Sequence, residues 1–299
     1  MLYIGDGTHS YYIQRPSTST DPIYVAMMPV ANQYFTFHAA NANGSNKYEY
    51  EVSNKTMEAN NWYELEISTT KLQTGATFGK FSIGVSNTVH FSQGNLQRIS
   101  GSWQFASHQY DVLGSWSSNS CDLFFWEATG NYGSRNSCIT STGTSSDVVN
   151  WGVNISGTWN TPSTTEWQYI FNSRGANSFA RGKVGTQTGV FLFPDHYTHP
   201  TDLSAITGMN ESDDFDWSTG NNFTALQWAK MEAAGAVFLP AAGYRNGTDV
   251  YDVGLIGIYW SSTADDDNFA WDVSFDEYFV SPDYNNFRNY GQSVRLVCE

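Results

Sequence analysis

Basic residues are scarce in this sequence. Its 299 residues include only 14 lysines and arginines but 29 aspartates and glutamates, so the formal net charge is −15. Nucleic-acid binding requires a basic surface that contacts phosphates, and binding to an anionic membrane requires one as well. The sequence also contains no apolar run of about 18 residues, the length of a transmembrane helix. We therefore expect no nucleic-acid partner and no insertion into a membrane.

Cysteine is rare too. Cys121, Cys138 and Cys298 match no zinc-binding or redox spacing. Cys121 and Cys138 could form a disulfide bond, or all three could be reduced thiols. A chain of this length buries enough surface to fold without a disulfide bond or a structural metal. We expect no cofactor and no bound metal.

Aromatic residues, in contrast, are abundant. They make up 16% of the chain, whereas only 14% of the residues are charged. Glycine, serine, threonine and asparagine are also frequent. This composition is typical of an extracellular, β-rich binding protein and not of a cytosolic α/β enzyme. We therefore expect an extracellular location.

The first 75 residues have the alternating pattern of β-strands. About four strands with one apolar face are too few for a closed sandwich, so we expect part of this domain to be missing or supplied by a neighbouring molecule. Met1 precedes what reads as the middle of a domain, which predicts a truncated form. The expected strands cover residues 23–30, 34–38, 47–52 and 62–67, with a turn at 43–44.

A Thr- and Gly-rich linker at about residues 70–79 leads into a second domain, residues 76–299. Two helices are predicted there. Ser163 and Glu166 form a capping box at the start of the first helix. The second helix covers about residues 224–234 and ends at Gly235. The sequence therefore predicts a mostly β protein with a few helices, of the α+β class.

The C-terminal part of this domain predicts one small antiparallel sheet. Its three strands are expected at residues 259–263, 270–275 and 293–297, because apolar and polar residues alternate there. The tryptophans of residues 103–159 are expected to lie mostly in the core. The side chains predicted to be buried in the small sheet are those of Trp260, Val273, Val294 and Leu296.

Three segments carry a family resemblance. Residues 161–170, TPSTTEWQYI, resemble a helix start of the formylglycine-generating, sulfatase-modifying family, a loop-rich variant of the C-type lectin fold. Residues 238–245, 259–263 and 291–297 resemble, in order, the C-terminal module of surface proteins of gut Bacteroidetes. In some of those proteins the module is the variable region of a diversity-generating retroelement. Residues 52–65 are similar to the end of a fimbrillin-type pilin domain.

The resemblance implies a fold and a function. Residues 1–75 would be a partial β-sandwich of the pilin type, and residues 76–299 a C-type-lectin-like domain. The protein would be an adhesin at the tip of a cell-surface pilus. Other pilin subunits would bind the N-terminal domain, and an unknown protein or glycan ligand would bind a variable segment at residues 250–290.

This segment mixes aromatic, acidic and small polar residues. Its residue types are those reachable from asparagine codons when adenines are randomised, as the resemblance implies. Tyr, Ser, Asp and Asn on a rigid scaffold are also what antibody paratopes use. The candidate ligand-binding residues are Tyr251, Asp252, Leu255, Ile256, Ile258, Asp265, Asp267, Phe269, Asp272, Ser274, Asp276, Tyr278, Phe279, Ser281, Asp283, Tyr284, Phe287 and Tyr290.

Other functions remain open. A carbohydrate-binding surface lectin of fixed specificity would have the same fold. A glycan-active enzyme would need an acid and a base in one cleft, and no carboxylate pair stands in a recognisable motif. Sulfatase-modifying chemistry would need a second thiol beside Cys298. We therefore expect no enzymatic activity.

Two groups of residues suggest a metal site. The acids at 265–267, with Asp272 and Asp276, could bind calcium, but no EF-hand or calcium-lectin signature accompanies them. A solvated turn is the alternative. His196 and His199 are close in sequence but have no evident third ligand. They are expected to pack against Tyr and Pro in a loop.

Overall fold

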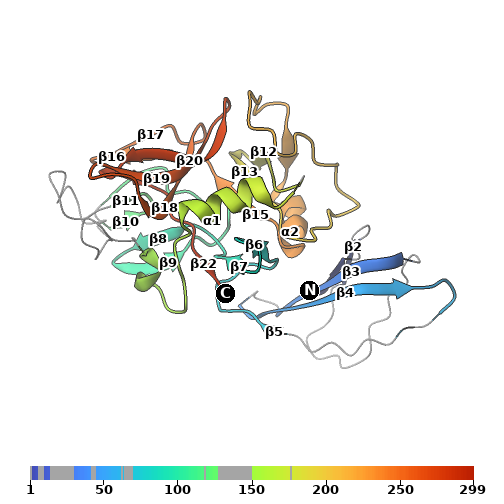
Figure 1. The fold of residues 1–299 in the computed structure, drawn as a ribbon. Coiled ribbons are helices and arrows are strands. Elements are labelled where there is room, and N and C mark those ends of the chain that lie inside the picture. The colour runs from blue at the N-terminus through green and yellow to red at the C-terminus, as the bar shows by residue number, and fades with distance from the viewer. Residues whose placement is uncertain are drawn as a thin grey trace.

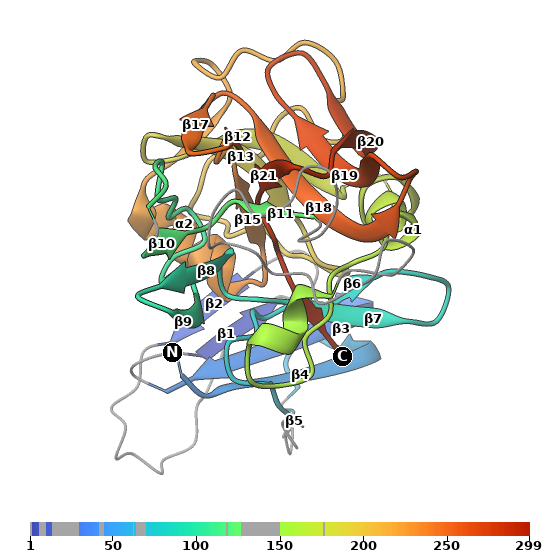
Figure 2. The ribbon, with the colours of Figure 1, turned by 90° about the vertical axis from the view of Figure 1, so that its left-hand side faces the viewer.

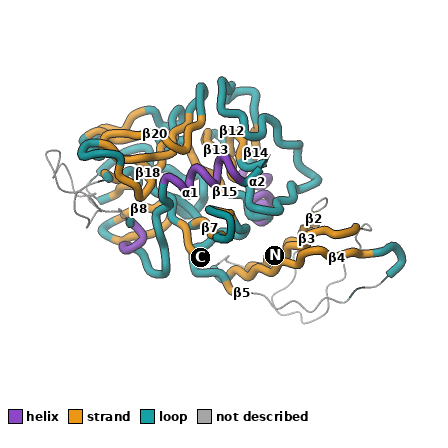
Figure 3. Tube along the Cα trace, viewed as in Figure 1, coloured by secondary structure: helices purple, strands orange, loops and turns teal. Residues whose placement is uncertain are grey.

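The computed structural model describes residues 2–5, 10–13, 30–41, 45–61, 63, 70–117, 119–126, 150–175 and 177–299. Strands dominate these residues and helices are few, which confirms the expected mostly β class (Figure 1). Long loops connect the strands over much of the trace (Figure 3). No helix of the described residues is long and apolar enough to cross a membrane.

The N-terminal strands form one sheet with the order β2-β1-β3-β4-β5. The two long strands β3 and β4 pair antiparallel, and they contain the strands expected at 34–38 and 47–52. The expected turn at 43–44 and nearly all of the strands at 23–30 and 62–67 lie outside the described residues. The strands are β1 (Leu2–Gly5), β2 (Ser10–Ile13), β3 (Val30–Ala40), β4 (Lys47–Met57) and β5 (Thr70–Lys71).

The other described strands form small sheets of three or four strands. One comprises β6 (Phe81–Ser82), β7 (Thr88–Phe91) and β22 (Val297–Cys298), and another β8 (Leu96–Ile99), β9 (Ser102–Phe105) and β10 (Ser120–Cys121). A third comprises β12 (Phe179–Val184), β13 (Gln187–Leu192), β14 (Asn221–Phe223) and β15 (Val237–Pro240). The last two comprise β11 (Phe124–Phe125), β16 (Tyr244–Asn246), β17 (Asp249–Tyr251) and β21 (Tyr290–Gln292), and β18 (Gly257–Ala264), β19 (Phe269–Phe275) and β20 (Val280–Phe287).

Both predicted helices are present. The helix α1 (Thr164–Gln168) starts at the Ser163–Glu166 capping box, continues as a π-helical turn at Tyr169–Ser173, and follows a 3-10 turn at Trp151–Asn154. The helix α2 (Ala225–Ala233) starts at a second capping box. Gly235 follows it with φ +100°, the left-handed conformation that glycine adopts without steric cost. Local capping chemistry therefore fixed where these helices begin and end.

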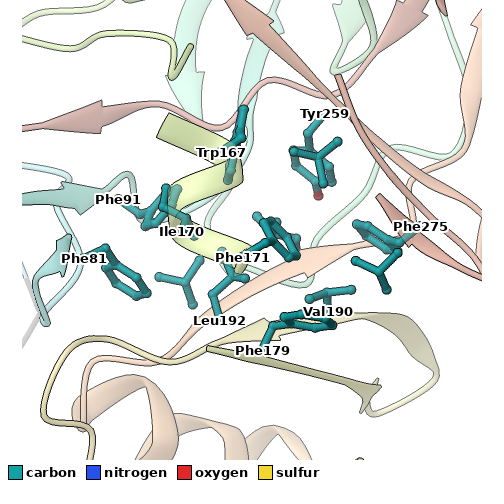
Figure 4. Packing of buried hydrophobic residues seen from close by; sticks show 14 of the residues in the cluster. Phe81, Phe91, Trp167, Ile170, Phe171, Phe179, Val190, Leu192, Tyr259 and Phe275 are labelled. Atoms are coloured by element: carbon teal, nitrogen blue, oxygen red, sulfur yellow. The ribbon is translucent and has the colours of Figure 1, made fainter. Parts of the chain in front are cut away.

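The main core lies between α1 and the small sheets. Trp167, Ile170 and Phe171 project from the helical segment into a cluster with side chains of β6, β7, β12 and β13 (Figure 4). Tyr259 of β18 and Phe275 of β19 reach the same cluster. Residues far apart in the sequence therefore share one core, which fixes the C-terminal strands against the rest of the domain.

The small C-terminal sheet differs from the expected one. β18 and β19 pair antiparallel as predicted, but the third strand is β20 and not residues 293–297. Ser293 instead forms a parallel bridge with Tyr259, and β22 pairs with β7. The prediction of the third strand was wrong because an apolar run indicates that a segment is buried but does not indicate which strand it pairs with. The predicted burial is confirmed for Trp260, Val273, Val294 and Leu296.

A buried histidine–glutamate pair of the N-terminal sheet also contacts the rest of the molecule. His38 of β3 places Nε2 3.1 Å from a carboxylate oxygen of Glu49 in β4. Its Nδ1 lies 2.8 Å from the carbonyl oxygen of Ala233 at the C-terminal end of α2. Glu49 also accepts a hydrogen bond of 2.7 Å from the backbone N–H of Gly79. Burial alone would raise the pKa of Glu49, but His38 and this N–H outweigh it and lower the pKa to about 2.

The first prediction concerns Trp260. Its side chain is fully buried and its Nε1–H donates a 2.7 Å hydrogen bond to the Phe124 carbonyl. We expect Trp260→Ala to lower the free energy of unfolding by about 3–5 kcal/mol, because it leaves a large cavity. Leu226→Ala, at an exposed site on α2, should change it by less than about 0.5 kcal/mol. Equal effects of the two substitutions in urea denaturation would contradict this packing.

The second prediction concerns Glu49. A carboxylate whose pKa is lowered on folding stabilises the protein above its ordinary pKa, and this stabilisation disappears as the pH falls towards the folded-state value. We expect Glu49→Gln to cost about 3 kcal/mol near neutral pH, with the difference from the wild type vanishing between about pH 5 and 2. Glu51→Gln, which removes a more exposed partner of Lys80, should cost less than about 1 kcal/mol. A pH-independent difference for Glu49→Gln would argue against the ion pair.

Candidate functional site

Five aromatic rings form a continuous row on the surface, which we call the aromatic strip. Adjacent ring centroids are 4.4–5.6 Å apart along the whole row. Tyr251 is 44% exposed at one end, and Phe287 is 39% exposed near the other. The remaining rings are half-buried. In order along the strip, the residues are Tyr251, Tyr244, Tyr290, Phe287 and Phe269.

Strand pairing brings these rings together. β16 and β17 form a hairpin with a two-residue loop in which Gly247 has φ +64°, and this register places Tyr244 opposite Tyr251. β16 also pairs with β21, which carries Tyr290. Phe269 and Phe287 lie directly opposite each other on β19 and β20. The strip therefore crosses two small sheets.

Two buried arginines lie beneath the strip. Arg245 donates hydrogen bonds to the Leu123 and Gly247 carbonyls, and its guanidinium lies 4.0 Å from the centroid of the Phe125 ring. Arg288 donates to the Phe269 carbonyl and lies 4.5 Å from the Trp126 ring. Backbone carbonyls and ring faces compensate the buried positive charges.

Gly291 allows the close approach of these strands. A Cβ at this position would lie 2.7 Å from the Leu123 carbonyl oxygen and 2.9 Å from the Arg245 side chain. A larger residue would push β21 away from β11, so the strip requires glycine here.

The structure brings part of the predicted site together in the strip. The strip includes four of the candidates, Tyr251, Phe269, Phe287 and Tyr290. Asp252 lies close enough to affect it: burial raises the pKa of the Tyr244 phenol, and the negative charge of Asp252 raises it further. Leu255 is 57% exposed in the turn that follows Asp252, and Ile256 is half-buried there.

A second group of candidate residues surrounds the turn between β19 and β20. Tyr278 is 64% exposed, and the Phe279 and Tyr284 ring centroids are 5.8 Å apart. The Asp276 carboxylate accepts hydrogen bonds from the backbone N–H groups of Tyr278 and Phe279 and so shapes the turn. Ser281 donates to Asp283, which also accepts from Gln168 of α1. This group is not part of the strip.

Three candidate residues are buried, so their assignment to the ligand surface is corrected. They are Ile258, Asp272 and Ser274. Asp272 accepts hydrogen bonds of 2.7 Å from the Ser274 hydroxyl and 2.9 Å from the Asn286 amide. Burial raises the pKa of Asp272 to about 7, although these hydrogen bonds oppose the rise. Strand alternation was a poor guide here because both faces of β19 are covered at this point.

The acidic run at 265–267 forms an exposed turn at the Phe269 end of the strip. Asp266 accepts hydrogen bonds from the backbone N–H groups of Asn268 and Phe269, and Asp265 accepts from the Asn285 amide. Asp267 is exposed in the same turn. The acidic run therefore forms an exposed turn. Within the described part of the chain, no three His, Cys, Asp or Glu residues are grouped to hold a metal ion.

His196 and His199 also lie in a loop as expected. The His196 ring stacks on Tyr34 with centroids 3.5 Å apart. The nitrogens of His199 lie 3.1 Å from the Tyr197 hydroxyl and 3.0 Å from the Ser204 carbonyl. They border a cavity of about 410 Å³ that also contacts Arg174 and Asp195. Both histidines therefore contact tyrosine side chains in this loop. Cys121 is buried, while Cys138, its potential disulfide partner, lies outside the described residues.

Tyr244 is the strip residue that sequence reasoning missed. It lies in the segment 238–245, which carries part of the family resemblance, and it is not among the candidate ligand-binding residues. The signal was present, because Asn246 and Gly247 mark a tight hairpin turn whose two-residue loop sets Tyr244 opposite Tyr251.

Residues 201–297 match the model of a family described as a domain of unknown function, DUF8237. The matched region contains all five residues of the strip and the whole segment 250–290. No curated protein and no solved structure matches the chain. The function of this region must therefore be inferred from its own geometry.

The third prediction concerns the buried Asp272. Because folding raises the pKa of this carboxyl, the folded state binds its proton more tightly than the unfolded state, and stability falls as the pH rises from about 4 to 7. Asp272→Asn removes this loss. As the pH rises from about 4 to 8, we expect the free energy of unfolding of the variant to increase by about 2–4 kcal/mol relative to that of the wild type.

Asp283→Asn is the matched control, because Asp283 is exposed on the neighbouring strand. Its difference from the wild type should stay nearly constant over the same pH range. A flat difference for Asp272→Asn as well, measured by chemical denaturation at each pH, would contradict the buried acid.

Proposed function

We propose that this protein is an adhesin that binds an external ligand through the aromatic strip and the surface around it. The observation that carries the proposal is the row of five adjoining rings at the surface. Exposed clustered aromatics are costly in water and are typical of binding surfaces, where aromatic anchors supply most of the affinity. The buried arginines and Gly291 support the rings from beneath, so little conformational entropy is lost when a ligand binds.

The position of the strip supports an adhesive role. The strands that carry it lie at the end of the molecule away from the N-terminal sheet, as two perpendicular views show (Figures 1 and 2). A protein anchored through its N-terminal sheet would thus present the strip outward. The contacts of His38 with the Ala233 carbonyl and of Glu49 with the Gly79 N–H would hold the two ends in a fixed relation.

A further proposal concerns the fold of the second domain and the variability of its C-terminal segment. We propose that residues 76–299 form a C-type-lectin-like domain whose segment 250–290 is diversified. In support, most candidate positions in this segment are exposed or half-buried, whereas scaffold residues such as Trp260 and Val273 are fully buried. Exposed positions on a buried scaffold can change with little loss of stability.

We propose that the N-terminal sheet is a partial pilin domain that joins the protein to other pilin subunits at the cell surface. Among the described strands, β2 pairs only with β1 and forms one edge of the sheet. An available edge can accept a strand from a neighbouring molecule. An unpaired edge remains a prediction, because residues 14–29 and 64–69 lie outside the described part of the chain.

The fourth prediction tests the strip. The full chain is screened on arrays of glycans and of synthetic peptides, and each hit is measured again with Tyr251→Ala and Phe287→Ala. We expect each substitution to weaken binding by about 30-fold, because loss of an aromatic anchor costs about 2 kcal/mol or more. The melting temperature should change little, because both rings are substantially exposed.

Leu226→Ala and Val153→Ala are the matched controls, since each removes an exposed apolar side chain elsewhere. They should leave binding unchanged. If every hit binds the strip variants and the controls equally well, the strip is not the ligand surface.

A further inference from the structure

The aromatic strip carries acids at both of its ends. Asp252 follows Tyr251 at one end, and its charge contributes to the raised pKa of the Tyr244 phenol. At the other end, Asp265 and Asp266 turn back on Phe269, and their backbone N–H groups both donate to its carbonyl. A ligand lying along the rings would therefore meet carboxylates at either end.

The basic side chains of the C-terminal segment that carries the strip are buried. Residues 231–299 contain three basic side chains, Arg245, Arg288 and Arg295, and all three are buried. Residues 249–290 contain nine acids against one base. The surface around the strip therefore has a negative potential that its own segment does not neutralise. An anionic ligand would be repelled from it and a cationic ligand attracted.

The rings favour the same charge. The faces of Phe and Tyr rings carry partial negative charge, and an ammonium or guanidinium over such a face gains about 0.5–2 kcal/mol. Flat guanidinium groups also stack on rings, as Arg245 does on Phe125 in the interior at 4.0 Å. Rings and carboxylates together bind cations better than either group alone.

The length of the strip indicates an extended ligand. Side chains on one side of an extended peptide are about 7 Å apart. Adjacent ring centroids are at most 5.6 Å apart, so every such side chain would lie over or beside a ring. A single small cation would contact only one or two of the five rings.

We infer that the aromatic strip binds an extended, arginine- or lysine-rich segment of a partner protein, with basic side chains over the rings and the carboxylates of Asp252 and the 265–267 turn at the two ends. This inference rests on the proposed function and names its ligand class. The charge complementarity of the strip and its flanking acids is what selects this partner over an acidic or neutral glycan.

The test uses the full chain and three synthetic ten-residue peptides that alternate serine with arginine, lysine or glutamate. We expect the arginine and lysine peptides to bind and the glutamate peptide not to bind. Raising the salt from about 50 to 500 mM should weaken binding at least several-fold, because exposed charges are screened over a few ångströms at high salt. Tyr251→Ala and Phe287→Ala should each weaken binding of the basic peptides about 10-fold or more.

Two triple variants of equal net charge separate a specific site from general attraction to an acidic protein. Asp265→Asn/Asp266→Asn/Asp267→Asn keeps the oxygen that caps the turn, and it should weaken binding at least 5-fold. Glu211→Gln/Asp213→Asn/Asp214→Asn removes the same number of exposed negative charges from a different loop. That loop lies beside the turn between β19 and β20, because the Ser212 carbonyl accepts a hydrogen bond from the Val280 N–H. This second variant should change binding less than 2-fold.

Equal losses in the two triple variants, or no binding of the basic peptides, would overturn the inference. If a neutral or acidic glycan from the arrays binds through the strip instead, the ligand class is wrong while the proposed function stands. If no probe depends on Tyr251 or Phe287, both proposals fail.

Discussion

The end of the protein that carries the aromatic strip depends on two buried arginines that lie over aromatic rings. Arg245 holds β16 to the segment of β11 through the Leu123 carbonyl, and Arg288 holds the end of β20 to β19 through the Phe269 carbonyl. Each guanidinium lies over a ring of the 125–126 segment. A buried charge must be compensated by nearby groups, so these contacts leave little freedom in how the strands pack. The positions of the five surface rings follow from that packing.

This arrangement divides the charges of the C-terminal segment between interior and surface. Its arginines are inside, and all of its acids except Asp272 lie outside the core. Burial raises the pKa of Asp272, and the hydrogen bonds from its neutral donors only partly oppose this rise. The surface thus combines aromatic rings and carboxylates without a competing cation from its own segment.

The other end of the molecule is joined by a different kind of contact. His38 lies between the Glu49 carboxylate and the carbonyl of Ala233 at the C-terminal end of α2, where the helix dipole favours a positive charge. Phe78 stacks on the same imidazole at 4.7 Å. The strip therefore lies at one end of the molecule, and a buried histidine contact joins the N-terminal sheet to α2 at the other end.

The sequence by itself determined the local features. Ser163 and Glu166 set the start of α1, Gly235 ended α2, and the acidic run at 265–267 formed the expected turn, because capping and turn formation depend on neighbouring residues. The tertiary structure alone decided that β20 and not residues 293–297 completes the C-terminal sheet, that Tyr244 joins the strip, and that Asp272 and Ser274 do not face solvent. Strand alternation shows that a segment has two faces, but only the packing of distant segments against each other determines which face is covered.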